Sequence, residues 1–108
     1  MININVFSKD GVYTGIELHG HAGYAEYGHD IVCAAVSMLT INTLNSIEAF
    51  TDDHFSVEAE EESGDLKFHL EGAISHDSQL LMNSLVLGLQ AVAEEYSKEY
   101  IKLQLEEV

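Results

Sequence analysis

The sequence predicts an α+β fold in which two helices pack on a mostly antiparallel sheet. Two observations predict it. Apolar and polar residues alternate in five short segments, as in half-buried strands, and two longer segments repeat their apolar residues at helical spacing. The resulting order is β-β-α-β-β-α-β. The 108 residues contain no proline and no internal repeat, so we expect residues 1–108 to form a single domain.

The first two strands are expected to form a hairpin. Residues 2–6 alternate, a second alternating run begins near Tyr13, and Lys9-Asp10-Gly11 between them is typical of a tight turn. Residues 20–28 contain three glycines and no apolar period, which predicts a loop. A helix is expected to follow over residues 31–50.

The second half of the chain is expected to form two further strands, a helix and a last strand. Residues 55–59 and 66–70 alternate as strands, and the acidic segment 61–65 between them predicts a hairpin loop. Residues 77–96 have helical spacing, and residues 101–105 return to the strand period. The second helix is apolar on more than one face, because Leu80, Leu87 and Ala91 lie off its main stripe. Either a second copy of the chain or the first helix could cover these side chains.

The charge excludes some classes of partner. The chain has 4 basic and 19 acidic residues, a net charge of −15, so its surface should repel nucleic acid and anionic lipid. The acidic surface either attracts a basic partner or serves solubility. The N-terminus lacks the features of a signal peptide, and we expect no segment long and apolar enough to span a membrane. These features predict a soluble, intracellular protein.

The single cysteine is the main candidate for chemistry. If Asp30 is the N-cap of the first helix, Cys33 lies in its first turn. Unpaired backbone N–H groups and the helix dipole would stabilise a thiolate there and could bind an oxyanion. The alternative is a small buried side chain with no chemical role. Ser37, one turn after Cys33, could supply a pocket hydroxyl or only a local hydrogen bond.

A cysteine nucleophile needs a base, and three histidines are near in sequence. His21 follows the second strand and could point across the loop towards the helix start, while the direction of His29 is uncertain. Asp30 could orient the imidazole or serve only as a cap. The same histidines, with His19 and Cys33, could instead bind zinc, although their spacing matches no standard zinc motif.

One motif resembles a known family. The string Gly20-His21-Ala22-Gly23, then Gly28, then Asp30-Ile31-Val32-Cys33-Ala34, closely resembles the ribosomal-processing cysteine protease family, often called Prp. The resemblance extends over the whole chain. It implies an αβ fold, a cytoplasmic homodimer, and a Cys/His dyad that falls here on Cys33 and His21, with no metal and no cofactor.

The resemblance also implies a substrate. Members remove a short N-terminal extension, apolar and aromatic near the cut, from a large-subunit ribosomal protein. Asp30 and Ser37 match supporting positions of the motif, and Gly20, Ala22, Gly23 and Gly28 belong to a loop that is thought to move over the substrate. The acidic chain suits a basic ribosomal protein and implies no direct contact with nucleic acid or membrane. The alternative is a non-catalytic acidic module that binds such a protein.

Overall fold

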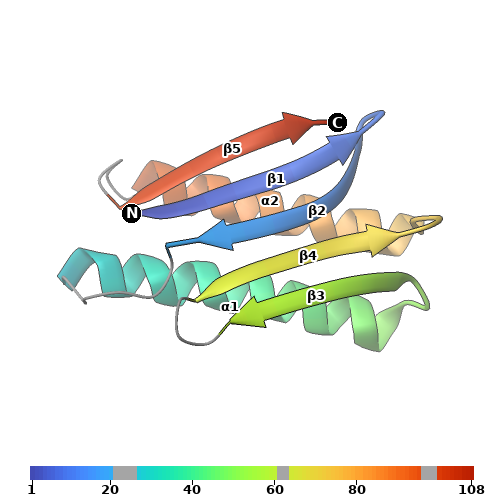
Figure 1. The fold of residues 1–108 in the computed structure, drawn as a ribbon, viewed down its shortest axis with the longest axis horizontal. Helices are drawn as coiled ribbons and strands as arrows, with labels where there is room; N and C mark the ends of the chain where they lie inside the picture. Colours follow the sequence, from blue (N-terminus) through green and yellow to red (C-terminus); the bar gives the residue numbers. More distant parts are fainter. Residues whose placement is uncertain (21–26, 61–63, 96–99) are drawn as a thin grey trace.

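The elements follow the predicted order. The computed structural model describes residues 1–20, 27–60, 64–95 and 100–108, with the backbone alone for residues 27–30. The elements are β1 (Ile2–Lys9), β2 (Val12–His19), α1 (Tyr27–Phe50), β3 (His54–Glu60), β4 (Asp65–Glu71), α2 (His76–Glu95) and β5 (Ile101–Glu107) (Figure 1). The predicted α+β fold, with two helices and a five-stranded sheet, is confirmed.

The sheet has the strand order β3-β4-β2-β1-β5. Its pairs are antiparallel, except that β5 runs parallel to β1. The β1–β2 hairpin turns at Asp10 and Gly11, whose φ angles are 53° and 81°. Two successive left-handed residues suit the right-handed twist of a hairpin, and Asp-Gly is a favoured pair for such a turn. The predicted turn at Lys9-Asp10-Gly11 is therefore confirmed.

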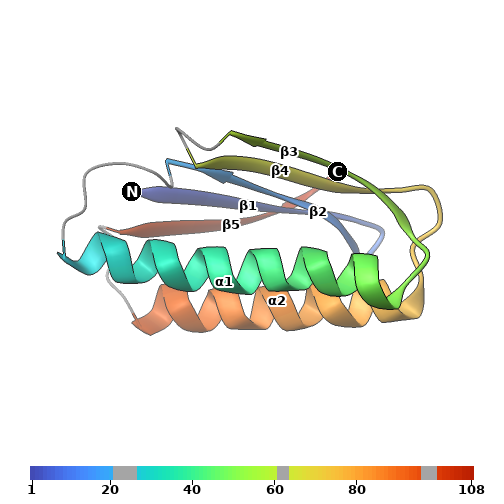
Figure 2. The same ribbon diagram turned by 90° about the horizontal axis from the view of Figure 1, so that it is seen from below.

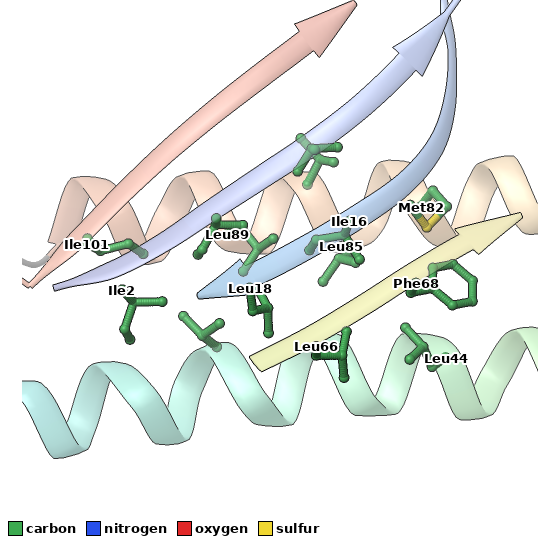
Figure 3. Close-up of a cluster of buried hydrophobic side chains, with 14 of the residues drawn as sticks. Ile2, Ile16, Leu18, Leu44, Leu66, Phe68, Met82, Leu85, Leu89 and Ile101 are labelled. Atoms are coloured by element: carbon green, nitrogen blue, oxygen red, sulfur yellow. The ribbon is translucent and has the colours of Figure 1, made fainter. Parts of the chain in front are cut away.

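Both helices pack on the same face of the sheet. Figure 2 shows α1 and α2 side by side beneath the strands. Between the layers lies a core of buried side chains from both helices and from strands β1, β2, β4 and β5 (Figure 3). Its largest members include Phe68, Ile2, Ile4, Ile16, Ile47, Met82, Leu85 and Leu89. Along β1, for example, Ile2, Ile4 and Val6 point into this core, and the residues between them point to the opposite, open face of the sheet.

Helix α1 begins earlier than the sequence indicates. It starts at Tyr27, so Gly28 and Asp30 belong to the helix, and the predicted N-cap at Asp30 is wrong. The predicted loop over residues 20–28 is correspondingly too long. The early start was not predictable, because the helical spacing of apolar residues begins only at Ile31, so no cap was sought before it.

The segment Ile31–Phe50 of α1 is long and apolar enough to cross a membrane by length and composition alone. The expectation that no stretch has these properties is therefore wrong. Packing explains part of this composition, since Val32, Val36 and Ile47 are fully buried in the core, while other large apolar side chains of the segment are exposed: Ile31, Met38, Ile41 and Phe50. Core helices commonly have such sequences, so this segment is weak support for a membrane span.

The outer side of α2 stays uncovered by α1. The two helices approach at Gly88, where an added Cβ would lie 3.1 Å from Leu39 Cδ1. Leu80 and Leu87 are 58% and 70% exposed, and Ala91 is also exposed. The alternative prediction that the first helix buries these side chains is therefore wrong.

Helix α2 begins at a serine cap that the sequence analysis missed. The Ser78 backbone N–H donates to Ser75 Oγ at 3.2 Å, as in an N-cap. The Ser75 backbone N–H and hydroxyl donate to Asp53 Oδ2 at 2.9 and 2.8 Å. Hydrogen bonds from Ser78 and Ser75 lower the pKa of Asp53 and outweigh the small opposing effect of its desolvation.

This arrangement predicts a pH-dependent stability. Because the pKa of Asp53 is lower in the folded chain, its ionised form contributes stability above the unfolded pKa, and that contribution is lost as the pH falls through the folded pKa. We expect Asp53→Asn to unfold at a lower temperature than the wild type at pH 6. The gap should close as the pH falls below about 4. Thermal unfolding of both proteins across this range tests it, and a gap independent of pH would contradict the assignment.

Candidate active site

Cys33 lies on the buried side of α1. Its side chain is half-buried and packs against the core, and the thiol is not in a disulfide. Because α1 begins at Tyr27, Cys33 occupies the second turn and not the first. Its N–H is therefore within the helical hydrogen-bonding pattern, and the dipole effect is strongest one turn earlier. The prediction that Cys33 offers an unpaired N–H for an oxyanion is wrong in this arrangement.

Ser37 follows Cys33 by one turn and borders a cavity. The cavity has a volume of about 150 Å³ and lies between α1 and the strand ends. Its lining includes Leu18, Ser37, Ile41, Ala59, Asp65 and Leu66. A second hollow of about 290 Å³, on the outer side of α1, shares Ser37 and Ile41 with it. Ser37 thus lies where an apolar side chain could be held beside the helix that carries Cys33.

The end of β2 is held in place just before His21. Gly20 has a φ angle of 74°, and a Cβ on this residue would lie 2.5 Å from the carbonyl oxygen of Met1. A side chain here would therefore be strained by both the backbone angle and the contact. The Gly20 N–H donates to Asp65 Oδ1 at 3.4 Å. The predicted site residues His21, Ala22 and Gly23 lie outside the described residues, as do the side chains of His29 and Asp30, and Gly28 is described only as part of the α1 backbone.

His19 faces the open side of the sheet. Its neighbour Leu18 is buried in the core, so the alternation of β2 places His19 on the side opposite α1. Its Nε2 lies 3.6 Å from Glu17 Oε1, and its Nδ1 lies 3.7 Å from Asp65 Oδ2. The geometry separates His19 from Cys33 and opposes their predicted joint zinc site. Within the ranges that the structure describes, no group of three or more potential ligands could hold a metal ion.

Glu17 joins two histidines on this open face. Its Oε2 lies 2.8 Å from His69 Nε2, and burial of Glu17 alone would raise its pKa. The hydrogen bond from His69 and the charge of that ring lower the pKa, and His19 and Lys67 add smaller contributions. Together they outweigh burial, so the pKa of Glu17 lies below its usual value. Glu17 therefore acts as an ionised partner for both imidazoles.

Asp65 makes contacts with the end of β2 that the sequence analysis did not predict. It was assigned to the acidic hairpin loop, whereas the structure places it at the start of β4, beside the end of β2. It is 45 residues from Gly20 in the sequence. A contact across that separation depends on strand pairing, and no local pattern of residues indicates it.

The fold is that of a small α+β protein, and its single cysteine, the candidate nucleophile, lies half-buried on α1. The family model described as cysteine protease Prp matches residues 1–102. The chain therefore belongs to the Prp family of cysteine proteases, and its predicted membership and its class as a cysteine-type peptidase are confirmed.

Individual relatives agree with this family. A ribosomal processing cysteine protease Prp from Staphylococcus aureus is 29% identical over 99 residues, 91% of this chain and 93% of the relative. The protein of the same name from Bacillus subtilis is 25% identical over 93 residues, 82% of this chain and 83% of the relative.

Solved structures extend the similarity to three dimensions. The S. aureus protease in complex with a substrate peptide superposes with a TM-score of 0.91 at 29% identity, covering 98% of this chain and 100% of that one. A structure of the S. aureus protease with a covalently linked product peptide gives a TM-score of 0.87 at 30% identity, with the same coverage. A Streptococcus mutans protein gives 0.87 at 34% identity, covering 100% of this chain and 96% of that one.

Proposed function

We propose that this chain is an endopeptidase that removes a short N-terminal extension from a large-subunit ribosomal protein. The observation that carries the proposal is the family match over residues 1–102, which places the only cysteine of the chain in a cysteine protease. The names of the relatives support ribosomal processing as the role, and the complexes of the S. aureus protease support a peptide as the substrate.

In the proposed mechanism, Cys33 is the nucleophile and His21 is the base. His21 takes the thiol proton, and the Cys33 sulfur attacks the scissile carbonyl carbon. The tetrahedral intermediate collapses when His21 returns the proton to the leaving amine, which leaves a thioester on Cys33. Water, deprotonated by His21, then attacks the carbonyl carbon of the thioester. The carbon–sulfur bond breaks, which releases the N-terminal product as a carboxylic acid and restores Cys33 as a thiolate beside protonated His21. Each step conserves atoms and protons within the dyad, the peptide and one water molecule.

Charge and surface support the remaining parts of the proposal. A net charge of −15 favours encounter with a basic ribosomal protein and disfavours contact with RNA. The cavity beside Ser37 is lined by Leu18, Ile41 and Leu66, and it suits an apolar side chain of the extension. We further propose that the protein acts in the cytoplasm as a homodimer. The exposed Leu80 and Leu87 on the outer side of α2 support a contact with a second copy.

The experiment that tests this function uses the ribosomal protein with its N-terminal extension as substrate. We expect the wild-type enzyme to generate one new N-terminus, measured by mass spectrometry, and the Cys33→Ala variant to generate none. A second substrate, with charged residues in place of the apolar ones near the cut, should be cleaved at least tenfold more slowly. Intact substrate after incubation with reduced wild-type enzyme would contradict the proposal and favour a binding module.

A further inference from the structure

Strand β3 forms one edge of the sheet. It stands at the end of the strand order, and among the described residues it pairs only with β4. Its seven residues keep a continuous register with β4, and all of them except Phe55 are exposed. A regular edge strand presents a row of backbone N–H and C=O groups with which another extended chain can pair.

The two faces of β3 differ in chemistry. Val57 lies opposite Phe68 of β4, which is buried in the core, so Val57 points to the helix side of the sheet, and Ala59 follows it there. Val57 is nevertheless 43% exposed. Glu58 and Glu60 alternate with these residues and point to the open face. The edge is therefore apolar towards the helices and acidic towards the open face.

A groove runs beside the helix side of this edge. Figure 1 shows α1 on the side of the sheet that ends in β3. The cavity of about 150 Å³ is lined by Ala59 of β3 and by Ser37 and Ile41 of α1. The hollow of about 290 Å³ shares Ser37 and Ile41 with it and extends along α1 past Met38. Together they form a groove, and Ile41 and Met38 in it are 50% and 73% exposed.

The helix along this groove is uncharged. Residues 31–47 contain no charged side chain, although 19 of the 108 residues of the chain are acidic. The acidic groups nearby belong to the strands, where Glu60 lies opposite Asp65 and Glu58 lies opposite Lys67. Two carboxylates directly opposite each other repel, so a cation beside Glu60 is favoured. The groove thus suits apolar side chains, and the open face of the edge suits basic ones.

We propose that the free edge of β3 binds an extended segment of the substrate protein as an additional strand, in which apolar residues alternate with basic ones. Backbone hydrogen bonds to β3 hold the segment, its apolar side chains enter the groove, and its basic side chains lie next to Glu58 and Glu60. Ser37 lies in the groove one helical turn from Cys33, so the segment binds close to the proposed nucleophile. That the segment belongs to the substrate rests on the proposed function, whereas the preference of the edge does not.

The charges favour this occupant over a second copy of the chain. Strand β3 carries two glutamates and neither lysine nor arginine, so two such edges would bring like charges together. The carboxylates oppose pairing of the edge with itself and still allow pairing with a basic strand. Strand β5, at the other edge, has Lys102 on its open face and so carries both signs of charge.

The test measures the binding of short fluorescent peptides to the Cys33→Ala chain by anisotropy. The first peptide alternates leucine with lysine, the second alternates leucine with glutamate, and the third has the composition of the first with its leucines in one block. We expect the first peptide to bind about tenfold more tightly than either of the others. In a Glu58→Lys, Glu60→Lys double variant the preference between lysine and glutamate should reverse, by about tenfold for two cross-strand pairs.

Two controls separate net charge and lost apolar surface from the edge itself. A Glu106→Lys, Glu107→Lys double variant makes the same change of charge on β5, four strand spacings or roughly 19 Å away, beyond the Debye length of about 8 Å at physiological salt. It should leave the preference unchanged. Ile41 and Leu105 are 50% and 51% exposed, and only Ile41→Gln should weaken binding of the first peptide, by about fivefold.

Two results would overturn the inference. Equal affinity for the first and third peptides would show that alternation is not recognised, and equal effects of the two charge variants would indicate net charge alone. If the Glu58→Lys, Glu60→Lys chain fails to fold, Glu58→Gln with Glu60→Gln decides the question, because it should abolish the preference for lysine over glutamate. Failure of the proposed function is a separate outcome, since a chain that cleaves no ribosomal protein can still discriminate between these peptides.

Discussion

Alanine in place of His21 should lower kcat/KM for peptide cleavage by about 10³-fold or more. The physical reason is that the thiol then has no positioned acceptor for its proton, and the leaving amine has no donor. Removal of a histidine from a catalytic unit of this kind has effects of this order or larger. The intrinsic nucleophilicity of a thiolate would leave some residual activity that rises with pH.

The measurement is steady-state cleavage of a peptide that spans the extension, at several pH values. His76→Ala is a matched control, because the His76 side chain is 89% exposed at the start of α2. That variant should retain wild-type kinetics. A His21→Ala enzyme with kcat/KM within tenfold of the wild type would remove His21 from the mechanism.

The largest expected effect on stability comes from Phe68. This residue of β4 is fully buried at the centre of the core and contacts the ring of Phe55, with the centroids 5.3 Å apart. Phe68→Ala leaves a cavity that the surrounding strands and helices cannot fill completely, so we expect a loss of about 3–5 kcal/mol in the free energy of unfolding. Denaturant unfolding measures this quantity.

Phe50→Ala is the matched control for Phe68→Ala. Phe50 ends α1 and is 75% exposed, so its removal should change the free energy of unfolding by no more than about 0.5 kcal/mol. Equal losses for the two variants would contradict the packing described here.

The strands were predictable because apolar and polar residues alternate along their sequences, and in β1 and β4 this alternation matches a regular alternation of buried and less buried side chains. Ile2, Ile4 and Val6 are all buried, and the turn at Asp10 and Gly11 has the chemistry that its backbone angles require. The helix starts were harder to predict. Asp30 looked like a cap but lies inside α1, and the true cap of α2, Ser75, depends on Asp53 from the preceding connection.

In the candidate site, too, relations between residues close in the sequence were predictable, and contacts between distant segments were not. Cys33 and Ser37 were predictable as a pair, because one turn of helix separates them and no tertiary contact is needed to relate them. Asp65 was not predictable as a partner of Gly20, because β4 reaches β2 only in the folded sheet. The family motif supplied His21 and Cys33 together, a pairing that spacing alone left open among three histidines.

The central claim, that Cys33 is the nucleophile, is tested most directly by rapid acid quenching and intact mass measurement. The chain has one cysteine, so a thioester can form at only one thiol. During turnover we predict an adduct equal in mass to the N-terminal product minus one water, lost on treatment with hydroxylamine and absent from Cys33→Ala. Cleavage at the wild-type rate by the Cys33→Ala enzyme would contradict the account.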